Sequence, residues 1–203
     1  MEKRLYNTFS KADIQATSVP MKVGILGTVN SAGLPHLTMI STLQANSLTE
    51  VIWVQFTEGL SKQHVRANPK TGFLIMTLDK QVWRGKARWE RVEKSGPEYD
   101  MYNNIPMFRY NAYFGVHTVY YMDLLEQYGR EPLPMGRVVS AAIQPKLAKL
   151  ARRERVKTEV LTPWTQALLN KLDNLKYVGY VSQDGYPVII PTIQAQCADA
   201  QHV

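Results

Sequence analysis

Between residues 22 and 92 the chain is a series of short β-rich segments, each ended by residues that favour turns. Only one short helix interrupts this series, and Asn68-Pro69 stops it because the residue before a proline disfavours the α conformation. Five or six strands with a single helix favour a closed antiparallel barrel over an alternating β–α sheet. Strands are expected at 22–30, 35–42, 51–57, 71–78 and 82–92, with the helix at 61–67.

The segments on either side of this series are expected to be partly helical. The first twenty residues read as a short helix or arm, and Ser95-Gly96-Pro97-Glu98 opens a further helix. The stretch Phe114–Tyr121 predicts the last strand of the barrel, and 129–134 predicts a linker. Thr162 is expected to cap a helix that has Leu168, Leu169 and Leu172 on one face.

Two segments near the two ends of the chain have a similar sequence pattern. Leu26–Pro35 and Val178–Pro187 share an apolar-Gly-x-Val strand, a polar turn closed by glycine, and a proline that opens the next strand, at a constant offset of 152 residues. The tail is therefore expected to be the opening hairpin of a second, incomplete barrel, or a hairpin that packs on the first barrel. A third reading stays open, in which the two segments are alike only because strand–glycine–strand hairpins resemble one another. We expect a barrel at 1–130, and at 131–203 a helical segment followed by this hairpin.

The positive charge is partly local. The chain of 203 residues has a net charge of +7, and residues 146–157 hold six basic residues and one acid. Leu147, Leu150 and Ala151 recur there at helical spacing, which predicts an amphipathic helix with a basic, solvated face. Binding of a polyanion is the alternative, but no aromatic residues interleave for base stacking, so nucleic acid is not the favoured partner.

Targeting signals and cysteine usage point to the cytoplasm. No run approaches the 18–20 apolar residues that cross a bilayer, so no membrane association is expected, and the first residues lack the apolar block of a signal peptide. The single cysteine, Cys197, excludes an intramolecular disulfide. We therefore expect a cytoplasmic protein.

Three motifs in order resemble a known family. They are Gly27-Thr28-Val29 followed by Gly33-Leu34-Pro35-His36-Leu37-Thr38, then Phe56-Thr57 with Ser61-Lys62 and Asn68-Pro69-Lys70, and then Arg84-Gly85-Lys86-Ala87. Together they resemble the pyridoxamine 5'-phosphate oxidase-like FMN-binding split-barrel flavoproteins, especially the small FMN-binding members. The resemblance covers about residues 18 to 125.

This resemblance implies a fold, an assembly and a site. The expected fold is mainly β with flanking helices: a six-stranded antiparallel Greek-key split barrel, followed by C-terminal helices and a hairpin. The expected assembly is a homodimer with FMN at the subunit interface. The resemblance implies that Lys62, with Ser61 and Gln63, holds the phosphate. It also implies that the isoalloxazine and ribityl groups run along Thr38, Met39, Ile40 and Ser41, with Gln55, Phe56 and Thr57 completing the wall.

The residues themselves allow this site and leave alternatives open. A flavin phosphate needs cations and N–H donors, and Lys62 is expected at the start of a short helix, where the dipole also favours an anion. Lys62 could equally be a solvated surface lysine, and Thr38 and Ser41 could face solvent. Trp83 and Trp89 could flank a flavin ring or belong to the core or a dimer interface.

Other kinds of chemistry find little support in the sequence. His36, His64, His117 and His202 are far apart and lack ligand spacing, so no metal site is expected, and His64 is expected at the surface. The chain has no Gly-x-Ser-x-Gly, Walker or Rossmann glycine pattern. The expected function is a flavin-dependent oxidoreductase that transfers hydride or electrons, with substrate and catalytic residues unassigned. The alternatives are a non-catalytic flavin carrier or sensor, and a module for another anionic ligand such as a deazaflavin, haem or nucleic acid.

Overall fold

The computed structural model describes residues 4–54, 56, 58–107, 115–133, 160–171, 173–192, 195–197 and 199–202. Two compact units can be separated by their internal contacts. The first consists of residues 1–133 with 179–189, and the second of residues 134–178 with 190–203. The two units are described separately below.

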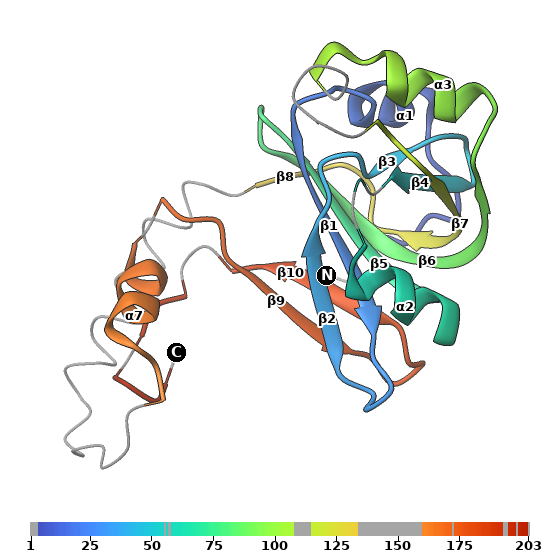
Figure 1. Cartoon of the computed structure of the whole chain (residues 1–203). Helices are drawn as coiled ribbons and strands as arrows, with labels where there is room; N and C mark the ends of the chain where they lie inside the picture. Colours follow the sequence, from blue (N-terminus) through green and yellow to red (C-terminus); the bar gives the residue numbers. More distant parts are fainter. Residues whose placement is uncertain are drawn as a thin grey trace. The chain divides into compact units, whose positions relative to one another are not determined.

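A curled antiparallel sheet forms the first unit (Figure 1). Its strands are β1 (Lys22–Val29), β2 (Pro35–Met39), β3 (Gln44–Ala45), β4 (Glu50–Val54), β5 (Lys70–Thr77), β6 (Gln81–Glu93), β7 (Val119–Gln127) and β8 (Glu131–Pro132). They follow the order β2-β1-β5-β6-β7-β4-β3, and β8 pairs with β6. The jump from β1 to β5 and the return from β7 to β4 give the Greek-key connectivity that the sequence predicted. The fold class, a mainly β split barrel with flanking helices, is therefore confirmed.

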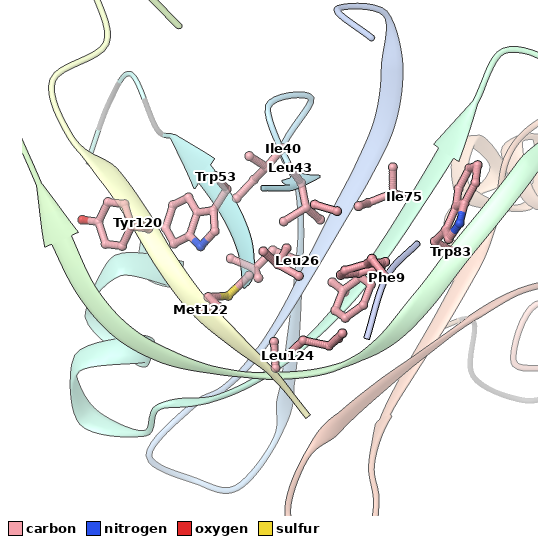
Figure 2. Close-up of a cluster of buried hydrophobic side chains, with 14 of the residues drawn as sticks. Phe9, Leu26, Ile40, Leu43, Trp53, Ile75, Trp83, Tyr120, Met122 and Leu124 are labelled. Atoms are coloured by element: carbon pink, nitrogen blue, oxygen red, sulfur yellow. The ribbon is translucent and has the colours of Figure 1, made fainter. Parts of the chain in front are cut away.

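The sheet curls around an apolar core, and alternate side chains of its strands point into that core. In β1, Leu26 points into the barrel and is fully buried, whereas its neighbour Gly27 faces the other side. Figure 2 shows the side chains that meet inside the barrel. The buried cluster includes Phe9, Leu26, Ile40, Leu43, Trp53, Phe73, Ile75, Trp83, Tyr120 and Met122. Trp53 stacks on Tyr120 with ring centroids 4.0 Å apart.

Helices α1, α2 and α3 accompany the barrel in the part of the chain that the structure describes. Helix α1 (Lys11–Thr17) begins with a capping box in which Ser10 and Asp13 exchange hydrogen bonds. Helix α2 (Leu60–Ala67) lies between β4 and β5, and helix α3 (Pro97–Asn104) lies between β6 and β7. Pro97 stands in the first turn of α3, as predicted from Ser95-Gly96-Pro97-Glu98. The predicted short helices near residues 61–67 and after residue 95 are thus confirmed.

The last barrel strand was predicted in the wrong place. The predicted bounds were Phe114–Tyr121, but β7 runs from Val119 to Gln127, and residues 115–118 are not in a strand. Its second half, Met-Asp-Leu-Leu-Glu-Gln, consists largely of residues that favour helices. Pairing with β4 on one side and β6 on the other overrides this preference, and Met122 and Leu124 alternate into the core.

The tail forms the hairpin that Asp184-Gly185 predicted. Strand β9 (Tyr177–Val181) pairs with β10 (Pro187–Pro191), and Gly185 has a φ of +81°. Helix α7 (Pro163–Asn170) precedes it and belongs to the second unit, and the Thr162 side chain accepts a hydrogen bond from the N–H of Thr165 as expected. The predicted basic helix at 146–157 lies outside the described residues. No helix in the described part of the chain combines the length and apolar character needed to cross a membrane.

Candidate functional site

A pocket of about 300 Å³ opens beside the end of β2. The chain leaves β2 at Met39, bends through residues 40–43 and supplies most of the pocket wall; Val54 and Phe56 from the end of β4 form the other side. The lining residues are Thr38, Met39, Ile40, Ser41, Thr42, Val54 and Phe56. The wall contains both hydroxyl groups and apolar side chains, which suits a ligand with both a flat apolar part and polar edges.

The bend after β2 is held against β1 by a close backbone approach. The N–H of Ile40 donates to the carbonyl of Gly24 at 2.7 Å. A Cβ atom on Gly24 would lie 2.1 Å from the Ile40 carbonyl oxygen, so only glycine permits this contact. The wall residues are therefore positioned by the barrel itself.

Thr42 fixes the pocket wall from behind. Its hydroxyl donates to the carbonyl of Val54 at 2.8 Å and accepts from the N–H of Val54 at 3.0 Å. The hydroxyl of Tyr102 on α3 donates to the carbonyl of Thr42 at 2.6 Å. Tyr102 is fully buried, and burial raises its pKa well above the usual value, so it remains a donor at neutral pH. The bend is thus tied to both β4 and α3.

Thr38 links the pocket to helix α2. Its hydroxyl lies 2.8 Å from Oγ of Ser61 and 2.8 Å from Nε2 of His36. Ser61 is almost fully buried at the start of α2. Residues 36 and 38 share one face of β2, so the strand presents both side chains to the helix. The structure therefore joins Thr38, which is half-buried, to the buried Ser61.

Two histidines meet between this face of β2 and helix α2. His36 and His64 are far apart in the sequence, but their ring centroids are 5.0 Å apart in an edge-on arrangement. His64, expected at the surface, is half-buried, and its Nδ1 lies 3.0 Å from the hydroxyl of Thr28. Burial, and then the neighbouring His64, lower the pKa of His36, so His36 is neutral at physiological pH. Within the described residues no group of three or more potential ligands could hold a metal ion.

Helix α2 begins with a buried cation and an open N-terminus. The N-cap residue is Gly59, whose lack of a side chain leaves the first turn without a side-chain cap. The Lys62 side chain is only 8% exposed, and its ammonium lies 3.4 Å from Glu58, whose side chain is 86% exposed. Because the contact is long and Glu58 is exposed, this ion pair holds Lys62 only weakly. The first turn of α2 therefore combines a cation, a buried hydroxyl and backbone donors.

The structure brings together part of the predicted site. Thr38, Met39, Ile40, Ser41 and Phe56 line the pocket. Ser61 joins them through Thr38, whereas Lys62 and Gln63 do not line the pocket; Gln63 is exposed on α2. Gln55 and Thr57 lie outside the described residues.

Sequence reasoning missed several partners of these residues and left two readings open for each of two tryptophans. Thr28 and His36 had no role in the predicted phosphate site, and Val54 was seen only as a strand residue; their places depend on pairing between distant segments. Trp83, a candidate to flank a ring, is fully buried and donates to Asp13 at 2.8 Å, so the core alternative holds. Trp89 is half-buried and packs against the same core.

A second, larger cavity lies elsewhere on the barrel. Its volume is about 700 Å³, and its lining is mostly apolar, with Val19, Met21, Leu78 and Met107 among the lining residues. Of the residues considered for the flavin site, only Trp83 lines it. It offers space, but it lacks the clustered hydroxyl groups and buried cation of the α2 region.

Comparison with known proteins gives matches among solved structures alone. No family model matches the chain. No curated protein matches it either.

Three of the solved structures that match are 13–15% identical in sequence to this chain. An FMN-binding protein from Syntrophomonas wolfei is 15% identical, with 61% of this chain and 84% of that chain covered and a TM-score of 0.46. A protein from Lactobacillus delbrueckii, assigned as a pyridoxamine 5'-phosphate oxidase, is 13% identical, with 61% and 96% covered and a TM-score of 0.47. An F420 reductase is 15% identical, with 58% and 95% covered and a TM-score of 0.43.

Proposed function

We propose that the barrel binds FMN beside the β2 bend and acts as a flavin-dependent oxidoreductase. The observation that carries this proposal is the first turn of α2, where the buried ammonium of Lys62 and the hydroxyl of Ser61 stand at an uncapped helix N-terminus. An anion is stabilised at such a position by the helix dipole, free N–H groups and a cation acting together. The polar link from Ser61 to Thr38 connects this anion position to a pocket.

The residues present fit the parts of FMN. The phosphate would be held by Lys62, Ser61 and the backbone donors of α2, with Gln63 at the rim. The ring and ribityl chain would run along Thr38, Met39, Ile40 and Ser41, opposite Phe56 and its neighbours Gln55 and Thr57. When bound, FMN supplies the hydride or electron transfer between a donor and an acceptor.

The chain's own residues would orient the cofactor rather than perform acid–base chemistry. Because His36 is neutral, Lys62 would be the main cation facing the phosphate. Thr42 and Tyr102 hold the wall rigid, which would keep the ring in one orientation and limit the entry of water.

The pocket of one chain is small and open, and this supports completion by a second copy. Its volume of about 300 Å³ lies at the low end of ligand sites, which span roughly 300–1,000 Å³. We therefore retain the homodimer, with FMN at the interface, as part of the proposal. A cytoplasmic location, favoured by the single Cys197, is also part of it.

The test begins with the purified full chain. We expect flavin absorbance, and mass spectrometry of the small molecule released on denaturation should give FMN. Lys62→Met should weaken FMN binding about 10- to 100-fold, since hydrogen bonds to charged groups contribute roughly 1.5–3 kcal/mol. Lys11→Met, at an exposed position on α1, is the matched control and should leave binding unchanged.

The remaining outcomes separate the alternatives. A colourless chain that also fails to take up added FMN would refute the proposal. A released deazaflavin or haem would keep an anionic ligand but replace FMN. Bound FMN without turnover of reduced nicotinamides and common acceptors would identify a carrier or sensor instead of an enzyme.

A further inference from the structure

The two hairpins at the ends of the chain have the same backbone. Adding 152 to the bounds of β2 (Pro35–Met39) gives the bounds of β10 (Pro187–Pro191). In the first turn, Asn30 N–H donates to Leu34 at 3.0 Å and Gly33 N–H to Asn30 at 3.0 Å. In the second, Ser182 N–H donates to Tyr186 at 2.9 Å and Gly185 N–H to Ser182 at 2.8 Å. Gly33 and Gly185 have φ values of +75° and +81°.

The contacts between the two hairpins are reciprocal. A Cβ atom on Gly27 would lie 3.4 Å from Cδ1 of Ile189, and a Cβ atom on Gly179 would lie 2.9 Å from Cδ2 of Leu37. At the offset of 152, Gly27 corresponds to Gly179 and Leu37 to Ile189. Residue i of one hairpin thus touches residue j of the other, while j touches i. Contacts of this kind define a two-fold, isologous interface.

The barrel face that receives β9–β10 is shaped for it. Gly27 pairs with Leu37 on β2 and with Gly72 on β5, so these three residues form one row across the sheet. The two glycines leave room for the tail: a Cβ atom on Gly72 would lie 2.0 Å from the carbonyl oxygen of Pro187. Ile189, which packs over Gly27, is only 3% exposed. We call the row of Gly27, Leu37 and Gly72 the pairing face.

Ionic contacts favour the chain's own hairpin at this face. The Lys86 ammonium lies 2.7 Å from the Asp184 carboxylate, and the Lys70 ammonium donates to the Asp184 carbonyl at 2.6 Å. The corresponding residue of the first hairpin is Ala32, which offers no carboxylate. A β1–β2 hairpin from another molecule would therefore make the same apolar contacts without this ion pair.

We propose that the pairing face is a two-fold self-association surface, whose partner is the β1–β2 hairpin of a second copy of this chain. The β9–β10 hairpin imitates that partner and occupies the face within its own chain. Self-association through this face is consequently blocked until β9–β10 is displaced. The proposal does not depend on FMN binding, because the pairing face lies on the side of β1 and β2 opposite to Thr28, His36 and Thr38.

Displacement of the hairpin in the full chain tests this idea. Ile189→Asp puts a carboxylate against Gly27, where burial of an unpaired charge is strongly unfavourable. We expect this variant to show twice the wild-type mass by light scattering after gel filtration. Val178→Asp introduces the same charge at a position that is 48% exposed on the same hairpin, and it should keep the wild-type mass. Adding Leu37→Asp to Ile189→Asp should restore the wild-type mass, because it spoils the pairing face itself.

Three outcomes overturn the proposal. They are a folded Ile189→Asp chain of wild-type mass, an association without fixed stoichiometry, and a doubled mass that survives Leu37→Asp. If Ile189→Asp does not fold, disulfide trapping replaces it. In a Cys197→Ala background, Gly27→Cys with Pro187→Cys should close a bond within one chain, since a Cβ at Gly27 lies 3.2 Å from Cβ of Pro187. The oxidised chain should keep the wild-type mass, and failure to form this bond, or its formation between chains, would contradict the proposed arrangement.

Discussion

The β1–β2 and β9–β10 hairpins share a turn but differ in their surroundings. β1 is buried along almost its whole length, whereas no residue of β9 is fully buried. Both turns rely on a glycine with positive φ and on the same pair of backbone hydrogen bonds. Local turn chemistry therefore determines the hairpin backbone, and the neighbouring strands determine how much each hairpin contributes to stability.

The largest expected contrast comes from one pair of equivalent positions. Leu26 is fully buried in the barrel, while Val178, its counterpart, is 48% exposed. Leu26→Ala should lower the free energy of unfolding by about 2–5 kcal/mol because it leaves a cavity, and Val178→Ala by less than about 0.5 kcal/mol. Urea denaturation measures both. Equal losses would show that burial does not separate the hairpins.

The next contrast concerns Lys22 at the start of β1. At the offset of 152 residues, β9 begins later than β1 and has no counterpart of this residue. Burial lowers the pKa of Lys22 to about 8, and its ammonium donates to the Val19 carbonyl at 2.7 Å. Below pH 8 the folded state must hold a charge that the unfolded state keeps in water, so this destabilisation is complete there. It declines as the pH rises from 8 towards the ordinary lysine value.

Lys22→Met should therefore stabilise the protein near neutral pH by about 2–3 kcal/mol. This figure takes 1.36 kcal/mol for each unit by which burial lowers the pKa and subtracts the contribution of the hydrogen bond to Val19 that is lost. The gain should shrink as the pH approaches the ordinary lysine pKa. Thermal unfolding at several pH values, with the exposed Lys11→Met as control, measures it. A gain that is constant with pH would contradict the burial argument.

The two turn glycines should respond almost equally to alanine. Gly33→Ala has open space around it, so only the strain of positive φ is expected, about 1 kcal/mol. Gly185→Ala meets the same strain, and its Cβ would also lie 2.8 Å from the Lys70 ammonium, which must move. Its loss should be larger by a few tenths of a kcal/mol. A smaller loss at Gly185 than at Gly33, by chemical denaturation, would exclude a shared turn.

The smallest contrast concerns Asp184, an acidic residue in the turn between β9 and β10 whose counterpart in the turn between β1 and β2 is Ala32. A hydrogen bond from Lys86 lowers the pKa of Asp184 to about 2. For Lys86, burial acts to lower the pKa, but the hydrogen bonds to Asp184 and Glu126 dominate and raise it to about 12. The stabilisation by Asp184 is therefore present above about pH 4 and is lost as the pH falls towards 2.

Because the Asp184 side chain is 51% exposed, Asp184→Asn should cost less than about 1 kcal/mol at pH 6 and less still at pH 3. Hydrogen exchange of the β9–β10 amides compares the two conditions. Asp173→Asn, whose side chain is 72% exposed, serves as the control. An effect that grows in acid would contradict the assigned ion pair.

The sequence predicted the elements whose signals are local. Strands β1, β2, β4, β5 and β6, the helix stopped by Asn68-Pro69 and the hairpin at Asp184-Gly185 follow from periodicity and turn residues, whereas the two-residue strand β3 was not predicted. The position of β7 did not follow, because two neighbouring strands outweigh the helical preference of Met122–Gln127. Of the site, the family resemblance named residues 38–41, but the predicted strand ran to residue 42 and the bend that follows Met39 was not predicted. The approach of His36 to His64 and the Tyr102–Thr42 bond were not, since both join segments far apart in sequence.

The hydrogen bond from Tyr102 to Thr42 couples the pocket wall to helix α3, although no residue of α3 lines the pocket. Substitutions along α3 that shift Tyr102 would alter the spacing between the bend and β4 while every wall residue stays the same. Ligand preference is thereby open to gradual adjustment from outside, and a search for specificity variants of this barrel should include α3 alongside the wall.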